Sequence, residues 1–308
     1  MKLSTATRLL AVSACVPATG TLYAQSPSTN LFDYFGQVPP GNTAQIFAPS
    51  IISNNTTKEG ALAISPKGDE VFFVRGQWPN TTIMQMKKSN GEWSTAVTAA
   101  FSEDCGATEP AFSPDGRYLY FSSNRGKSEI RDYSIWRVEN LGDGMWSRPE
   151  SLFDIDGGSV WEFHPTLTAQ GELFFCYWDA AHQRGDVYVS HEEDGSWSEP
   201  LKVEAPVSTD FSEVDPFVDA DGRFMLFSSN RPGGLGGEDQ YVSVRDADGV
   251  WTQPYNLGLT FNTDGDDFDM DLTPDGKYIL LYREGDVYWM GCTPLEAIFK
   301  SAQAKKGE

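Results

Sequence analysis

The sequence contains few cysteines, few histidines and few basic residues. Its 308 residues include 4 cysteines, 3 histidines and 23 lysines and arginines, against 44 aspartates and glutamates, so the formal net charge is −21. Such an acidic protein repels the phosphates of nucleic acids and anionic membrane surfaces, and we expect neither as a partner. A strongly anionic polymer is also disfavoured as a ligand, unless a metal ion or local basic groups intervene.

The cysteine pattern excludes several kinds of site. No two cysteines stand in a CxxC motif, so the sequence indicates neither a zinc site nor thiol redox chemistry. Outside the N-terminal segment the cysteines are Cys105, Cys176 and Cys292. Their pairing stays open, but an odd number leaves at least one thiol free in a monomer, which is the oligomeric state we expect. Cys176 lies in the apolar run LFFCYW, which is typical of a buried side chain.

No segment is long and apolar enough to span a bilayer. At the N-terminus, Lys2 and Arg8 accompany the apolar stretch LLAVSACVPATGTLYA, which is typical of a bacterial export signal. We expect residues 1–24 to be a signal peptide cleaved after Ala24, which places the protein in the periplasm or outside the cell. Alternatively, VSAC is a lipobox, and cleavage before Cys15 produces an outer-membrane lipoprotein.

The sequence does contain one pattern that occurs five times. Each copy is a short apolar strand, a turn of the Pro-Asp-Gly type and a second apolar strand, as in FSPDGRYLYFSSNR. The copies span residues 64–76, 112–125, 167–179, 218–231 and 272–285. Proline pre-sets φ for the turn and glycine accepts a positive φ, so each copy predicts a β-hairpin. A period of about 50 residues is typical of a β-propeller or another repeat array.

Each of the first four repeats continues with a third strand and a GxW motif, which together complete a four-stranded antiparallel blade. We expect the recurring tryptophans to pack between neighbouring blades. The fifth repeat lacks the motif, and residues 43–53 can supply its missing strand and close the ring without a free edge. We therefore predict an all-β, five-bladed propeller over residues 41–292, with six blades as the alternative. An extended lead-in at 25–40 precedes it, and a short C-terminal helix and tail at 293–308 follow.

The SPDG hairpin followed by FSSNR resembles the PD40 repeat, a WD40-like repeat of the TolB-type propellers. The stretches FSSNRPGGLGGEDQYVS (227–243) and WTQPYNLG (251–258) are similar to a long form found in bacterial envelope proteins. The lead-in at 34–49 resembles secreted, single-domain members. The resemblance implies a propeller that acts as a binding scaffold, a periplasmic assembly factor or a non-catalytic domain of a peptidase. It transfers no catalytic residues to this chain.

The innermost strand of each repeat should line the central channel, and two of its positions carry mainly acids. Five residues before the turn proline, or the residue aligned with it, stand Ala61, Glu109, His164, Asp215 and Asp269. Seven residues before it stand Glu59, Ala107, Glu162, Glu213 and Asp267. Because side chains alternate along a strand, both positions should face the same side. Phe163 and Phe268, which lie between them, should point into the blade core.

Several carboxyl groups and one histidine in a single funnel suggest chemistry. Crowded carboxylates cannot all ionise freely, and a raised acid beside an ionised one is the pair needed for glycoside hydrolysis. The candidate catalytic residues are Glu109, His164, Asp215 and Asp269. The candidate ligand-binding acids are Glu162, Glu213 and Asp267. The same groups could instead hold a divalent cation such as calcium, or only satisfy channel waters and backbone groups.

Two further pairs are candidates for ligand binding. Arg125 and Arg231 end the SSNR motif, where they form either structural ion pairs or a clamp for a carboxylate. Trp161 and Trp178 depart from the repeat near His164, and such aromatics are candidates for stacking on a sugar.

Three functions therefore stay open. The first is an exported propeller that binds a small ligand, a carbohydrate or a peptide, at an acidic channel. The second is a glycan hydrolase or lyase that uses the channel carboxylates and His164. The third is an envelope scaffold that binds other proteins through its outer faces.

Overall fold

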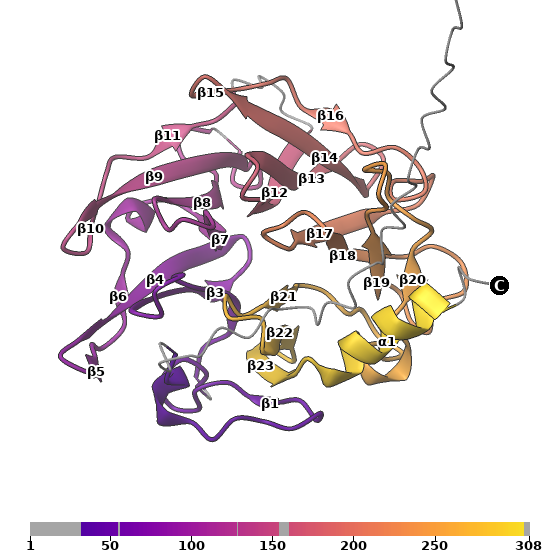
Figure 1. Ribbon diagram of the computed structural model, residues 1–308. Coiled ribbons are helices and arrows are strands. Elements are labelled where there is room, and N and C mark those ends of the chain that lie inside the picture. The colour runs from indigo at the N-terminus through magenta and orange to yellow at the C-terminus, as the bar shows by residue number, and fades with distance from the viewer. Residues whose placement is uncertain (1–31, 55, 128, 154–159, 305–308) are drawn as a thin grey trace, which may run out of the picture.

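The computed structural model describes residues 32–54, 56–127, 129–153 and 160–304. In this part of the chain, five antiparallel sheets stand around a common centre as the blades of a propeller (Figure 1). The prediction of an all-β, five-bladed propeller is therefore confirmed, against the six-bladed alternative. The expected signal peptide at 1–24 and the end of the tail at 305–308 lie outside the described residues.

The strands of each blade follow one another from the centre outward. The inner strands are β2 (Glu59–Ile64), β7 (Ala107–Phe112), β12 (Val160–Leu167), β17 (Glu213–Val218) and β21 (Met270–Leu272). The second strands are β3 (Glu70–Gln77), β8 (Tyr118–Ser123), β13 (Glu172–Asp179), β18 (Phe224–Ser229) and β22 (Tyr278–Arg283). The third strands are β4 (Asn80–Ser89), β9 (Ser134–Gly142), β14 (Arg184–Glu193), β19 (Asp239–Val244) and β23 (Asp286–Gly291).

The outermost strand of the first three blades is divided into two short segments that both pair with the third strand. These segments are β5 (Glu92–Trp93) and β6 (Val97–Thr98), β10 (Met145–Trp146) and β11 (Glu150–Ser151), and β15 (Ser196–Trp197) and β16 (Leu201–Lys202). The fourth blade ends in β20 (Tyr255–Asn256).

The GxW tryptophans join neighbouring blades, as predicted. The Trp146 ring of the second blade packs against Phe72 of β3, with ring centroids 5.6 Å apart. Trp251 of the fourth blade packs in the same way against Phe174 of β13, at 6.0 Å. These recurring tryptophans are therefore part of the interblade core and are not free to stack on a ligand.

The hairpins between first and second strands follow from their turn residues. Gly116 has a φ of 71°, and its N–H donates to the carbonyl of Ser113 at 2.8 Å. A residue with a Cβ rarely adopts this φ, which explains the glycine. The hydroxyl of Ser113 in turn accepts the N–H of Tyr118 at 2.9 Å and fixes the start of the second strand.

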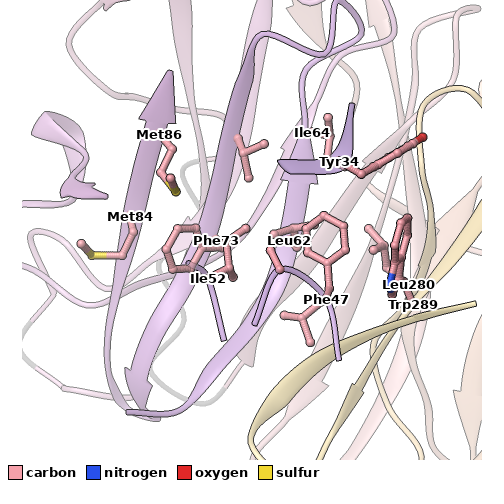
Figure 2. Packing of buried hydrophobic residues seen from close by; sticks show 13 residues of the cluster. Tyr34, Phe47, Ile52, Leu62, Ile64, Phe73, Met84, Met86, Leu280 and Trp289 are labelled. Carbon is pink, nitrogen blue, oxygen red and sulfur yellow. The ribbon is translucent and has the colours of Figure 1, made fainter. Parts of the chain in front are cut away.

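The ring closes where the two ends of the propeller meet. Strand β1 (Gln45–Ile46) pairs with β23, so the segment before the first repeat supplies the outer strand of the last blade, as predicted. Figure 2 shows the apolar cluster at this joint, in which Phe47 and Trp289 approach Leu62 and Phe73 of the first blade. Phe47 and Trp289 are fully buried, with ring centroids 5.2 Å apart. Burial of this cluster, more than the two-residue strand, stabilises the closure.

Helix α1 (Thr293–Ala304) follows the last strand and lies beside the fourth and fifth blades (Figure 1). Phe299 of the helix packs against Phe224 of β18, with ring centroids 4.9 Å apart. Three short 3₁₀ helices are η1 (Tyr34–Gly36), η2 (Ala100–Ser102) and η3 (Gly258–Thr260). Among the described residues, no helix has the length and apolar character needed to cross a membrane.

Candidate functional site

Each inner strand, or the segment leading into it, bends at the same place, five residues before its turn position. The residue there has a positive φ in all five repeats: 34° at Ala61, 53° at Glu109, 56° at His164, 51° at Asp215 and 57° at Asp269. In β12 the pairing register shifts at this point, between Phe163 and Thr166, as expected for a β-bulge. A positive φ costs a non-glycine residue about 1–3 kcal/mol and persists only where the surrounding structure imposes it.

These five positions form the central ring (Ala61, Glu109, His164, Asp215 and Asp269). Around it, backbone N–H groups meet a carboxylate of the preceding blade. The N–H of His164 donates to Glu109 Oε2 at 2.7 Å, and the N–H of Ala61 donates to Asp269 Oδ2 at 3.1 Å. The N–H of Asp269 likewise donates to Asp215. The structure thus brings together all four residues that the sequence singled out as candidate catalytic groups.

The acids two residues earlier do not face the ring, so the expectation that both positions share one side is wrong. The bulge adds a residue and breaks the alternation on which that expectation rests. Glu213 is fully buried and accepts the N–H and the hydroxyl of Thr209 at 2.8 and 2.6 Å. Asp267 accepts the backbone N–H four residues before it at 2.6 Å, and Glu162 accepts the N–H of Ile135 at 2.8 Å. These three carboxylates hold loops and neighbouring strands.

Arg125 and Arg231 are also bound within the blades. Arg231 Nη2 lies 3.0 Å from Glu213 Oε1 and donates to the carbonyl of Val207 at 2.6 Å. Arg125 donates to the carbonyl of Phe101. The contacts of Arg231 correspond to the structural ion pair, one of the two alternatives that the sequence left open. Arg125 makes hydrogen bonds within its blade, and no ion pair of Arg125 is seen among the described residues.

His164 lies among the acids, and its Nδ1 makes no hydrogen bond. Nδ1 lies 3.8 and 3.7 Å from carboxylate oxygens of Asp215 and Asp269, whereas Nε2 lies 3.6 Å from Asp271 Oδ1. Burial by itself lowers the pKa of His164. The carboxylates of Asp271, Asp269 and Asp215 outweigh this effect and hold the pKa well above its ordinary value.

The pKa values of the carboxyl groups in the central ring are raised, as expected from the sequence for crowded acids. Burial raises the pKa of Glu109 to about 7 and that of Asp269 to about 7, and it also raises the pKa of Asp215. His164 opposes the shift in all three cases. Protonated and ionised carboxyl groups therefore coexist in the ring near neutral pH, which is the condition for proton donation and acceptance at one site.

The aromatic pocket, a cavity of about 410 Å³, opens at the end of the channel where the inner strands begin. Its wall includes Trp161 of β12 and Trp178 of β13, which are direct cross-strand partners. Partners in an antiparallel pair project to the same face of the sheet, and here that face is the pocket wall. Both tryptophans that the sequence selected because they depart from the repeat therefore line one cavity.

The aromatic pocket reaches the central ring, because Glu109 and Asp215 line it as well. Phe163 and Phe268 are further lining residues. The expectation that these two phenylalanines point into the blade core is therefore wrong. Each is followed by a residue with a positive φ, His164 or Asp269, which changes the side that faces inward.

Trp78 and Arg131 are among the lining residues that were not identified from the sequence. Trp78 lies between β3 and β4 with 39 % of its surface exposed, and its ring centroid is 6.3 Å from that of Trp161. Arg131 places its guanidinium carbon 4.7 Å from the centre of the Trp78 ring. Both lie in connections between the second and third strands, where the repeats differ most in length and sequence. The divergence of the repeats in these connections was the only feature of the sequence that could have indicated Trp78 and Arg131.

A second cavity lies on the other side of the ring, among the hairpin turns. This turn-side cavity has a volume of about 170 Å³ and is lined by turn prolines such as Pro66 and Pro114, together with Glu109, His164 and Asp271. Glu109 lines both cavities, so the central ring forms the partition between them.

Two sets of described residues offer three ligand atoms within 4.8 Å of one another. One set is Glu109, His164 and Asp215, and the other is His164, Asp269 and Asp271. Each combines an imidazole with two carboxylates, a donor set that divalent cations accept.

No protein-family model matches the chain, and no curated protein matches it. Among solved structures it is similar to TolB from Acinetobacter baumannii, with 16 % identity and a TM-score of 0.46 over 76 % of this chain and 52 % of that one. It is also similar to a thermostable family-43 glycoside hydrolase, with 15 % identity and a TM-score of 0.49 over 77 % of this chain and 89 % of that one. A third similar structure is an α-L-arabinofuranosidase from Lactobacillus brevis, with 12 % identity and a TM-score of 0.49 over 76 % of this chain and 90 % of that one.

The chain thus spans about half the length of the TolB chain that it matches. At these identities the similarities concern the propeller fold, and membership of the PD40 family stays a prediction.

Proposed function

We propose that this protein binds a carbohydrate in the aromatic pocket. The observation that supports the proposal is the cross-strand pair Trp161 and Trp178 next to the ring carboxyls Glu109 and Asp215. Indole faces offer a flat apolar surface to the C–H face of a sugar, while carboxyl groups exchange hydrogen bonds with its hydroxyls. The volume of about 410 Å³ falls in the range of small-ligand sites, roughly 300–1,000 Å³.

The charge around the pocket favours a neutral sugar. The chain carries a formal charge of −21, and the pocket lining holds the two ring acids Glu109 and Asp215 against one cation, Arg131. A carboxyl group with a pKa of about 7, as at Glu109, donates a hydrogen bond when protonated and accepts one when ionised. Such a group can satisfy a hydroxyl in either role, whereas it repels a uronate.

The test is a binding titration with neutral gluco-, xylo-, arabino- and chito-oligosaccharides, followed by tryptophan fluorescence and calorimetry. We expect Trp161→Ala and Trp178→Ala each to weaken binding at least about tenfold, equivalent to ~1.4 kcal/mol. The control is Phe211→Ala, which removes an aromatic ring that is 41 % exposed and lies outside the aromatic pocket. Absence of binding across the panel, or equal losses in the control, contradicts the proposal. If the protein binds short peptides and no oligosaccharide, the result would favour a peptide as its ligand.

A second candidate, glycan hydrolysis, rests on the spacing of the acids. Ligand atoms of Glu109 and Asp215 lie within 4.8 Å, and the pKa of Glu109 of about 7 suits a general acid. A carboxyl separation of about 5 Å is typical of hydrolases that retain the anomeric configuration. If the protein is a catalyst, Glu109→Gln and Asp215→Asn should abolish turnover of a bound oligosaccharide while leaving its binding measurable. Binding without any released sugar would limit the function to recognition.

A further inference from the structure

We propose that the central ring carries a second, separate site for a divalent first-row transition cation, Mn²⁺ or Zn²⁺, held by His164, Asp269 and Asp271. The site faces the turn-side cavity, whereas the proposed carbohydrate site occupies the aromatic pocket on the other side of the ring. It is therefore independent of whether a sugar binds.

The inference rests on two buried atoms that could bind a metal ion and that have no hydrogen-bond partner. His164 is only 5 % exposed, yet its Nδ1 has no hydrogen-bond partner, and Asp269 Oδ1 has none either. These two atoms lie 3.7 Å from each other. A buried polar atom without a partner is costly, so such atoms are rare unless an ion, a water or a ligand meets them. The other oxygen of Asp269, Oδ2, is already used, because it accepts the N–H of Ala61.

The distances fit coordination better than direct hydrogen bonding. One imidazole binds an ion through only one of its nitrogens, and we place the ion on Nδ1, which has no hydrogen-bond partner. The separation of 3.7 Å between Nδ1 and Asp269 Oδ1 exceeds hydrogen-bond length. Ligands on a tetrahedral ion with bonds of ~2.1 Å stand about 3.4 Å apart, so a small inward movement would close such a shell. The ligand atoms of His164, Asp269 and Asp271 all lie within 4.8 Å.

The donor types select the class of ion. Calcium prefers six to eight oxygens, and here a buried imidazole is a central donor. One imidazole with two carboxylates suits Mn²⁺ or Zn²⁺, and this set of described residues contains no cysteine. The adjoining turn-side cavity of about 170 Å³ leaves room for water to fill the remaining coordination positions.

The competing account makes His164 an imidazolium that pairs with the surrounding acids without any ion. The two accounts differ in what the protein takes up from solution. A metal site binds one equivalent of Mn²⁺ or Zn²⁺, whereas an imidazolium in the same place repels a cation.

The experiment uses the full chain without a histidine tag, stripped with a chelator and dialysed. Mn²⁺ binding is followed by the loss of the free-ion electron paramagnetic resonance signal, and Zn²⁺ and Ca²⁺ binding by calorimetry. We expect one equivalent of Mn²⁺ or Zn²⁺, bound at least about tenfold more tightly than Ca²⁺. His164→Gln and Asp271→Asn should each weaken Mn²⁺ binding at least about tenfold. The matched controls His191→Gln and Asp264→Asn alter exposed residues and should leave it unchanged.

No uptake of Mn²⁺ or Zn²⁺ by the folded wild-type chain overturns the proposal, as does uptake that His164→Gln and Asp271→Asn both retain. Asp271→Asn keeps the shape of the side chain, so it serves as the decisive variant if His164→Gln does not fold. Trp161→Ala should leave Mn²⁺ binding intact. Failure of the metal site and failure of the carbohydrate site are therefore distinguishable.

Discussion

Replacing Glu162 with glutamine should make the protein more stable at alkaline pH. Glu162 is 2 % exposed, and burial raises its pKa from an ordinary value of 4.5 to about 7. The folded state therefore holds its proton over a pH range in which the unfolded chain has lost it. Stability falls as the pH rises from 4.5 to about 7 and is constant above that. At about 1.36 kcal/mol per pH unit, the loss amounts to at most ~3 kcal/mol.

Glutamine removes this ionisation and keeps the hydrogen bond. Its amide oxygen can accept the N–H of Ile135, which now donates to Glu162 Oε2 at 2.8 Å. We therefore expect Glu162→Gln to match the wild type near pH 4.5 and to exceed it at pH 8 by up to ~3 kcal/mol. Other groups titrate equally in both proteins, so their contributions cancel in the difference.

The measurement is urea unfolding followed by tryptophan fluorescence at pH 5 and pH 8, with Glu193→Gln as control for an exposed glutamate of β14. A variant that is less stable than the wild type at pH 8 would refute the reasoning. That result would mean that Glu162 is ionised in the fold and stabilised by a cation such as Lys127, which opposes the shift of its pKa.

Three further substitutions test contacts that stabilise the propeller outside the central ring. Arg231→Ala leaves Glu213 buried without its cation and should lower the unfolding free energy by ~3–5 kcal/mol in urea, whereas a loss below about 1 kcal/mol would contradict the pairing. Phe47→Ala should cost ~3–5 kcal/mol and make the N-terminal segment sensitive to protease, because it empties the fully buried position at the ring closure. Gly236→Ala should lower the melting temperature, since a Cβ there overlaps the carbonyl oxygen of Gly265; an unchanged value would show that the loop yields freely.

Much of the fold could be predicted from the sequence because its signals are local and repeated. The turn at Ser113 to Gly116 is specified by residues a few positions apart, and five copies of that pattern leave few architectures other than a propeller. The closure by β1 was predictable for a related reason: one repeat lacks an outer strand, and an unpaired edge must be covered. The recurring tryptophans were assigned to interblade packing by the same periodicity.

The site was predictable only in part. The spacing identified the four acidic or imidazole members of the central ring, and their departure from the repeat identified Trp161 and Trp178. The same spacing argument placed Glu162, Glu213 and Asp267 on the wrong side of their strands. Strict alternation assumes a regular strand, and an irregularity of one residue turns the side chains on its two sides to opposite faces of the sheet. No local signal marks that bulge, since non-glycine residues such as His164 hold the positive φ.

The sequence by itself therefore predicted the repeated hairpins, the closure of the propeller and four residues at its centre, whereas the structure decided for five blades over six. Only the tertiary structure decided which side chains meet there. Trp78 and Arg131 are far from Trp161 in sequence, and they line the same pocket because three successive blades bring their loops to one end of the channel. The pKa of about 7 at Glu109 likewise depends on burial among other blades, a property that no stretch of sequence carries alone.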